Sequence, residues 1–74
     1  MKEKLFLLRK EHNQDNFSNL GTFVQRFDNN NLTTTEEITE SNLYNHIGDA
    51  MKVSVNIYDA LGVRYKVESI YIDD

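Results

Sequence analysis

Carboxylates are the residues of this chain whose number and spacing could do chemistry. The densest group is Glu36, Glu37 and Glu40. Paired carboxylates act as general acid and general base when their surroundings push their pKa values apart. A helix N-terminus explains the same group more simply, because acidic side chains there are stabilised by the helix dipole. We therefore do not interpret these glutamates as a catalytic pair.

The other residue types that support catalysis or metal binding lack the spacing they would need. His12 and His46 are the two histidines and there is no cysteine, whereas a zinc site needs three or four convergent ligands. A calcium loop starting at Asp28 would need Glu at its twelfth position, which is Thr39. No phosphate-binding glycine loop and no Gly-x-Ser-x-Gly motif occurs. We predict a protein that is not an enzyme and uses no metal or other cofactor.

Charge is unevenly distributed along the chain and indicates a binding role. The formal net charge is −4; residues 1–34 hold five basic and four acidic residues, and residues 35–74 hold three basic and eight acidic ones. Between Phe27 and Ala50 there is no Lys or Arg. Such a segment repels phosphates and attracts basic surfaces. We therefore expect no direct nucleic-acid binding, and a partner protein that has a basic, DNA-binding surface.

The side chains expected to meet this partner are acidic and lie in the second half of the chain. They are Glu36, Glu37, Glu40, Asp49, Asp73 and Asp74. On a helix, Glu36 and Glu40 would be ~6 Å apart along the axis, from the rise of 1.5 Å per residue. That distance approximates the spacing of successive phosphates along one DNA strand. The spacing favours the hypothesis that the acidic surface imitates nucleic acid.

The elements that would position these residues are organised around the segment from Lys52 to Ile72. Apolar and polar residues alternate from Val53 to Ile57, and alternate again from Val63 to Val67. A period of two in β-branched and aromatic residues predicts an antiparallel strand pair. Asp59–Gly62 supplies the turn residues between the two arms. Because one hairpin is only marginally stable in water, other elements must cover its apolar face.

The first part of the chain predicts one further strand and one helix. Lys2–Glu11 suits a helix or a strand, and we favour the strand because it would extend the hairpin into a sheet. Apolar residues from Phe17 to Phe27 recur at spacings of three and four, which predicts an amphipathic helix. A hairpin that bends at Asn19–Gly21 is the alternative.

The middle of the chain predicts a loop and then a second helix. Residues 28–35 are rich in Asn and Thr, which favour turns. A helix is predicted with Thr33 or Thr34 as its cap and with Glu36, Glu37 and Glu40 in its first turns. A helix that starts later, with Ser41 as its cap, is the alternative, and Gly48 and Asp49 would then end it before the hairpin. The fold class that we expect is α+β: a small antiparallel sheet built on the C-terminal hairpin, with one or two helices packed on it.

Length and composition predict a single domain over residues 1–74 in the cytoplasm. Roughly 60% of the unfolded chain's surface can be buried at this size, so a homodimer is one way to gain stability. The lack of cysteine fits a reducing compartment. The apolar run Leu5–Leu8 is much shorter than a secretory signal, and no apolar stretch approaches the length of a membrane span.

The chain resembles the small early proteins with which phages of low-GC bacteria disable host enzymes. The resemblance covers its length, its acidity, its asparagine content and its lack of cysteine and proline. Within that group it is similar to the sliding-clamp inhibitors of Twort-like staphylococcal phages. This resemblance implies a host-takeover protein that occupies the channel through which the clamp threads DNA and so stops host replication.

Leu5 and Phe6 enter the expected contact set through the same resemblance. The usual clamp-binding peptide ends in Leu-Phe after an upstream Gln, but Met1 to Lys4 supply no Gln. This difference favours the channel mode, in which the six acidic residues would face the basic lining of the ring. The alternatives are an anti-CRISPR or anti-restriction DNA mimic with another target, and a regulatory or structural phage protein without mimicry.

Overall fold

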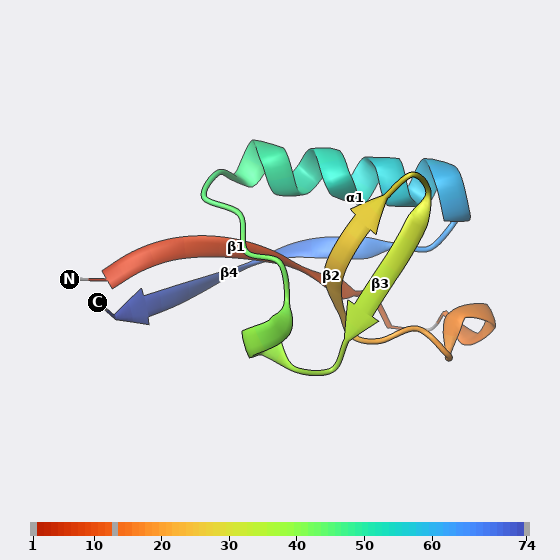
Figure 1. The fold of residues 1–74 in the computed structure, drawn as a ribbon, viewed down its shortest axis with the longest axis horizontal. Coiled ribbons are helices and arrows are strands. Elements are labelled where there is room, and N and C mark those ends of the chain that lie inside the picture. The colour runs from red at the N-terminus through yellow and green to blue at the C-terminus, as the bar shows by residue number, and fades with distance from the viewer. Residues whose placement is uncertain (1, 13, 74) are drawn as a thin grey trace.

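The first strand of the chain lies inside the sheet, where it has a neighbour on each edge. The computed structural model describes residues 2–12 and 14–73, and Figure 1 shows their arrangement. The elements are the strands β1 (Lys2–Lys10), β2 (Phe23–Asp28), β3 (Asn31–Thr35) and β4 (Tyr65–Asp73), the short 3-10 helices η1 (Asp15–Phe17) and η2 (Ile38–Glu40), and the helix α1 (Ile47–Leu61). The strand order is β3-β2-β1-β4 and every pairing is antiparallel. The predicted α+β class with a small antiparallel sheet is confirmed.

The longest pairing joins the two ends of the chain. β1 and β4 form nine residue pairs, from Lys2↔Asp73 to Lys10↔Tyr65. Neighbouring residues of a strand point to opposite faces, and both Leu7 and Leu8 are fully buried. β1 is therefore covered on both faces, as its run of four apolar residues requires. The preference for a strand over Lys2–Glu11 is confirmed.

The prediction of a first strand in the C-terminal hairpin is wrong, because Lys52–Tyr58 lies inside α1. The apolar residues of this segment fit both the two-residue period of a strand and the 3.6-residue period of a helix. Ala50, Val53 and Ile57 recur at spacings of three and four, and they pack against the core of the sheet. Val55, which completes the alternating pattern, is exposed instead. The helix ends at Gly62, whose φ of 77° is the left-handed conformation that Gly adopts without a steric penalty.

The predicted helix over Phe17–Phe27 is also wrong. Only η1 forms there, and the chain then enters β2, where Phe23 and Val24 are buried. β2 turns into β3 through Asn29 and Asn30, which both have positive φ, 50° and 63°. Two such residues give the turn twist that suits a two-residue hairpin loop. Part of the predicted loop over residues 28–35 is therefore strand β3.

The predicted second helix, with its cap at Thr33 or Thr34 or later at Ser41, is replaced by η2 and an extended connection. Asn42 N–H donates to the carbonyl of Val24 (2.9 Å). Tyr44 forms an antiparallel bridge with Phe6 through two backbone hydrogen bonds of 2.9 and 2.8 Å. These pairings occupy backbone groups that a helix would bond internally, so α1 begins only at Ile47.

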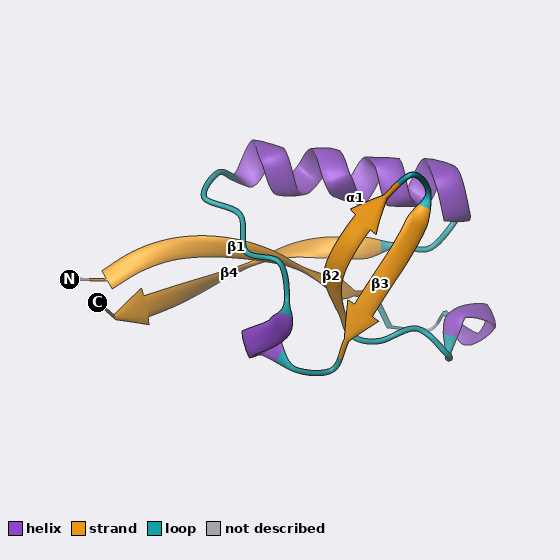
Figure 2. Ribbon diagram, viewed as in Figure 1, coloured by secondary structure: helices purple, strands orange, loops and turns teal. Residues whose placement is uncertain are grey.

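The main core lies between α1 and the sheet. Figure 2 shows the helix running along the β1–β4 pair, and α1 contacts both strands. The fully enclosed side chains of this core include Leu8, Val24, Ile57 and Val63. The hydroxyl of Tyr65 reaches across the core and donates to the carbonyl of Gly21 (2.9 Å). The segment before β2 is thereby fixed to β4, far from it in the sequence.

Gly21 lies where the chain passes closest to β3. Its N–H donates to Thr34 Oγ1 (2.7 Å), and a Cβ placed on Gly21 would lie 2.9 Å from that oxygen and from the backbone nitrogen of Thr35. Gly21→Ala should therefore lower the free energy of unfolding by about 1–3 kcal/mol, the usual cost of overpacking. Urea denaturation followed by circular dichroism measures this change.

Gly48→Ala is the matched control, because no atom lies within 4 Å of a Cβ at Gly48. Gly48 is in the first turn of α1, where Ala is the better helix former by up to about 1 kcal/mol. The control should be neutral or stabilising. Equal losses for the two variants would contradict the close approach at Gly21.

Candidate acidic binding surface

Glu36, Glu37 and Glu40 surround the short helix η2 just after β3. The carboxylate of Glu36 accepts a hydrogen bond from the hydroxyl of Thr22 (2.5 Å), and that of Glu40 accepts one from Thr35 (3.3 Å). All three glutamates are exposed, and none makes an ion pair with a residue of the described ranges. The structure therefore brings this predicted group together, although around a single turn instead of along a helix. We call these residues the η2 carboxylates.

Asp49 and Asp73, two of the other predicted acidic residues, lie away from the η2 carboxylates. Asp49 is in the first turn of α1, and Figure 1 places α1 and the green η2 turn on opposite sides of the β1–β4 ribbon. Asp73 ends β4, at the end of the molecule where the termini lie. Asp74 falls outside the described residues. Among the described residues, the other five carboxylates do not form one continuous row.

Basic and acidic residues are nevertheless distributed unevenly over the fold. β1, β4 and Arg64 carry six of the eight basic residues and three acidic ones, Glu3, Glu68 and Asp73. The stretch from β2 to the end of α1 carries six acidic residues and only two basic ones. Two of these acids, Asp28 and Asp59, were not predicted as contacts, and they line one hollow with Asn29, Asn30 and Asn56. Their proximity follows from the packing of the β2–β3 turn beside α1, which no sequence pattern indicated.

Leu5 and Phe6 contribute to the interior. Leu5 is 8% exposed, and Phe6 is partly buried against the core. The backbone of Phe6 pairs with Tyr44. In this fold Leu5 cannot enter a pocket on a partner without leaving the sheet, so the structure offers no Leu-Phe peptide of the clamp-binding kind.

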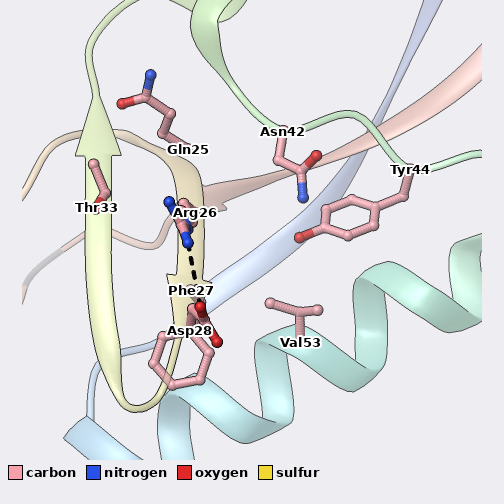
Figure 3. A pocket seen from close by; sticks show the side chains of 8 residues that line it. All are labelled: Gln25, Arg26, Phe27, Asp28, Thr33, Asn42, Tyr44 and Val53. Carbon is pink, nitrogen blue, oxygen red and sulfur yellow. Dashed lines mark hydrogen bonds and ion pairs between the residues drawn. The ribbon is translucent and has the colours of Figure 1, made fainter.

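A groove of about 650 Å³ with a mixed polar and apolar lining lies between the β2–β3 ribbon and α1 (Figure 3). Arg26 and Asp28 form an exposed ion pair of 3.2 Å on one side, and Asn42 and Tyr44 lie on the other side. Burial raises the pKa of Tyr44, and a hydrogen bond with Asn42 partly offsets this effect. Tyr44 therefore stays protonated at neutral pH, and the groove offers hydrogen-bonding groups beside the Arg26–Asp28 ion pair.

Neither a metal centre nor a membrane span is found in the part of the chain that the structure describes. Within residues 2–12 and 14–73, no three His, Asp or Glu side chains come close enough to hold a metal ion. No helix of these ranges has the length and apolar character that crossing a bilayer requires.

Comparison of the chain with protein-family models, with curated proteins and with solved structures found no match. The fold and the site define a small antiparallel α+β domain in which β1 is predominantly basic and the stretch from β2 to the end of α1 is predominantly acidic. The feature with a clear chemical use is the group of η2 carboxylates, which can accept hydrogen bonds and ion pairs from a basic surface.

The η2 carboxylates also affect the interior, because burial and then the charge of Glu36 raise the pKa of Tyr65 to about 12. The unfolded chain releases this proton near pH 10. The folded state therefore binds more protons between pH 10 and 12, and its stability falls over that range. The stabilisation that comes from the raised pKa of Tyr65 is complete below pH 10. A pKa shift of this size corresponds to a loss of about 2–3 kcal/mol of folding stability by pH 12.

Tyr65→Phe tests this assignment. The variant loses the hydrogen bond to Gly21 and about 1 kcal/mol at neutral pH, but its stability should fall less steeply from pH 10 to 12 than that of the unaltered protein. Urea denaturation at pH 8, 10 and 11.5 measures both slopes. Parallel slopes for the two proteins would contradict a raised pKa at Tyr65.

Proposed function

We propose that this protein is a non-enzymatic inhibitor that binds a DNA-handling host protein through its acidic side. The observation that carries this proposal is the group of η2 carboxylates, three exposed negative charges that form no ion pair within the described residues. A surface of this kind attracts a positively charged groove that normally binds phosphates. The host sliding clamp is the first candidate partner, as the resemblance to phage clamp inhibitors implies, and the site of action would then be the host cytoplasm.

The shape of the molecule suits the channel mode of inhibition. Its extents are 40 × 21 × 20 Å, so its two short dimensions are comparable to the width of a DNA duplex. A body of this width could lie in a channel that accommodates DNA and exclude DNA from it. The burial of Leu5 argues against the other mode, in which a Leu-Phe peptide enters a pocket on the clamp.

The η2 carboxylates would attract and orient the partner protein, and would contribute little to tight packing against it. Exposed charge pairs each contribute little to affinity, so several must act together. Their attraction reaches ~10 Å at 0.1 M salt and less at higher salt. A complex held in this way forms quickly at low salt and weakens as salt is added.

Neutralising the η2 carboxylates tests the proposal with little disturbance of the fold. The triple variant Glu36→Gln, Glu37→Gln, Glu40→Gln removes three charges and keeps an acceptor oxygen for Thr22 and Thr35. We expect its affinity for the purified clamp to fall at least about tenfold at low salt, which corresponds to ~1.4 kcal/mol. Isothermal titration calorimetry at two salt concentrations measures this change.

The matched control is Glu3→Gln, Glu11→Gln, Glu68→Gln, which changes net charge equally but alters β1, β4 and the residue after β1. At 0.1 M salt its affinity should stay within about twofold of that of the unaltered protein, because charges more than ~10 Å from the contact surface are largely screened there. Equal losses in both triple variants would mean that only net charge matters. Undiminished binding by the η2 variant would remove these carboxylates from the binding surface.

A further inference from the structure

β4 is an edge strand of the sheet, and its outer side has no partner strand within the described residues. Successive residues of a strand direct their backbone groups to opposite edges. On the inner side, Glu11 N–H donates to the carbonyl of Arg64 (3.0 Å), and this pairing continues the β1–β4 register. Even-numbered residues of β4 therefore bond to β1, and odd-numbered residues direct their N–H and C=O groups outward.

Part of this outer edge is already covered. The hydroxyl of Ser54 in α1 donates to the outward carbonyl of Tyr65. Beyond it, the outward groups of Val67, Ser69 and Tyr71 have no backbone hydrogen-bond partner in the described chain. These three residues form a free edge that is symmetric about Ser69.

An apolar flank of α1 lies beside this free edge. Ile47, Met51, Val55 and Tyr58 recur at spacings of four, four and three, and each is between 45% and 57% exposed. The hydrogen bond from Ser54 to β4 turns this flank toward the outer edge of the sheet. The opposite flank of the helix, with Asn56 and Asp59, lies toward the β2–β3 ribbon. We call the four residues the α1 flank.

Tyr71 adds a second exposed apolar group next to the edge. It is 63% exposed, the largest value among the exposed apolar side chains of the described residues. Alternation along β4 places it on the same face as Tyr65 and Val67, which is the face that α1 covers. Each copy of the molecule thus presents unpaired backbone, an apolar helix flank and a projecting tyrosine on one side.

We propose that a second copy of this chain docks on this side, with β4 pairing antiparallel to β4 of the partner subunit about a twofold axis at Ser69. In this register Ser69 faces the partner's Ser69, and Val67 faces the partner's Tyr71. All three free residues then find hydrogen-bonding partners, and the two four-stranded sheets form one continuous sheet. The inference is independent of the proposed inhibitory function.

The apolar groups complement one another in this arrangement. Val67 and Tyr71 form a β-branched–aromatic cross-strand pair in each half of the interface, a favourable combination. A strand rises about 3.3 Å per residue and a helix 1.5 Å. Ser54 in the middle of α1 lies beside Tyr65 at the start of β4. With these rises per residue, the first turns of α1 lie beside Val67 and Ser69. Ile47 and Met51 of one copy would therefore cover Tyr71 of the other.

Charge and size also suit a second copy as the occupant. On the face of β4 that α1 covers, no residue from Tyr65 to Tyr71 is charged. Lys66 and Glu68 point to the other face of the sheet. The η2 carboxylates, which would repel their copies, belong to a different edge of the molecule. A stable interface buries about 800 Å² per partner, about 15% of the 5218 Å² surface of this chain.

Ser69→Cys tests the register directly, because the chain has no other cysteine. Directly opposed residues that are hydrogen-bonded across antiparallel strands lie ~5.5 Å apart at Cα, within the range that a disulfide spans. Mild oxidation of this variant should give a covalent dimer, visible on a non-reducing gel. The matched control is Ser18→Cys, whose exposed thiol lies after η1. Cross-linking of Ser69→Cys no faster than that of Ser18→Cys would overturn the proposed register.

A second pair of variants tests the apolar part of the interface. Met51→Glu adds a charge to the α1 flank, and Asn56→Glu adds the same charge to the opposite flank. Sedimentation equilibrium should show the dimer dissociation constant raised at least about tenfold by Met51→Glu and changed less than about twofold by Asn56→Glu. An unaltered protein that stays monomeric up to ~1 mM, the weak limit of specific association, would overturn the proposed dimer.

Discussion

The pairing of β1 with β4 is the interaction on which the rest of this structure depends. It joins the first ten residues of the chain to the last ten in nine consecutive pairs. Everything between the two strands is one closed loop, whose ordering costs entropy before any long-range contact forms. The burial of Leu7 and Leu8 on opposite faces of β1 offsets that cost. The other elements then attach to this ladder: α1 across one face, and β2 and Tyr44 along the second edge of β1.

This arrangement also determines where charge lies. β1 carries four of the eight basic residues, whereas the stretch from β2 to the end of α1 carries six acidic residues and two basic ones. Because η2 follows an edge strand, its carboxylates remain in water, with hydroxyl neighbours instead of cationic ones. β4 lies at the opposite edge of the sheet. An acidic contact surface and a self-pairing edge can therefore coexist without competing for the same residues.

The sequence predicted an element correctly where the spacing of its apolar residues fitted one kind of element. It was misleading where the spacing fitted a strand and a helix equally well. The strands at both ends of the chain, the α+β class and the grouping of Glu36, Glu37 and Glu40 could all be predicted. The segment from Ala50 to Ile57 fits both an alternating strand and a helix, and only the pairing of β4 with β1 decides between them. Phe23 and Val24 fit a helix by spacing, but each is buried on its own face of β2.

The remaining features depend on tertiary arrangement and have no local pattern. The free edge of β4 exists because β1, and not the segment before β4, is its neighbour. Met51 and Val55 are exposed because of the orientation in which α1 packs along the β1–β4 pair. The meeting of Asp28 with Asp59 follows from the packing of the β2–β3 turn beside that helix.

Hydrogen exchange of the β4 amides by NMR, at a concentration where the protein is monomeric, tests the central ladder most directly. The N–H groups of Lys66, Glu68, Ile70 and Ile72 should exchange slowly because they bond to β1. Those of Val67, Ser69 and Tyr71 should exchange fast because they face water. Slow exchange of the second set in the monomer, or fast exchange of the first set, would show that β4 pairs with a different strand or in a different register.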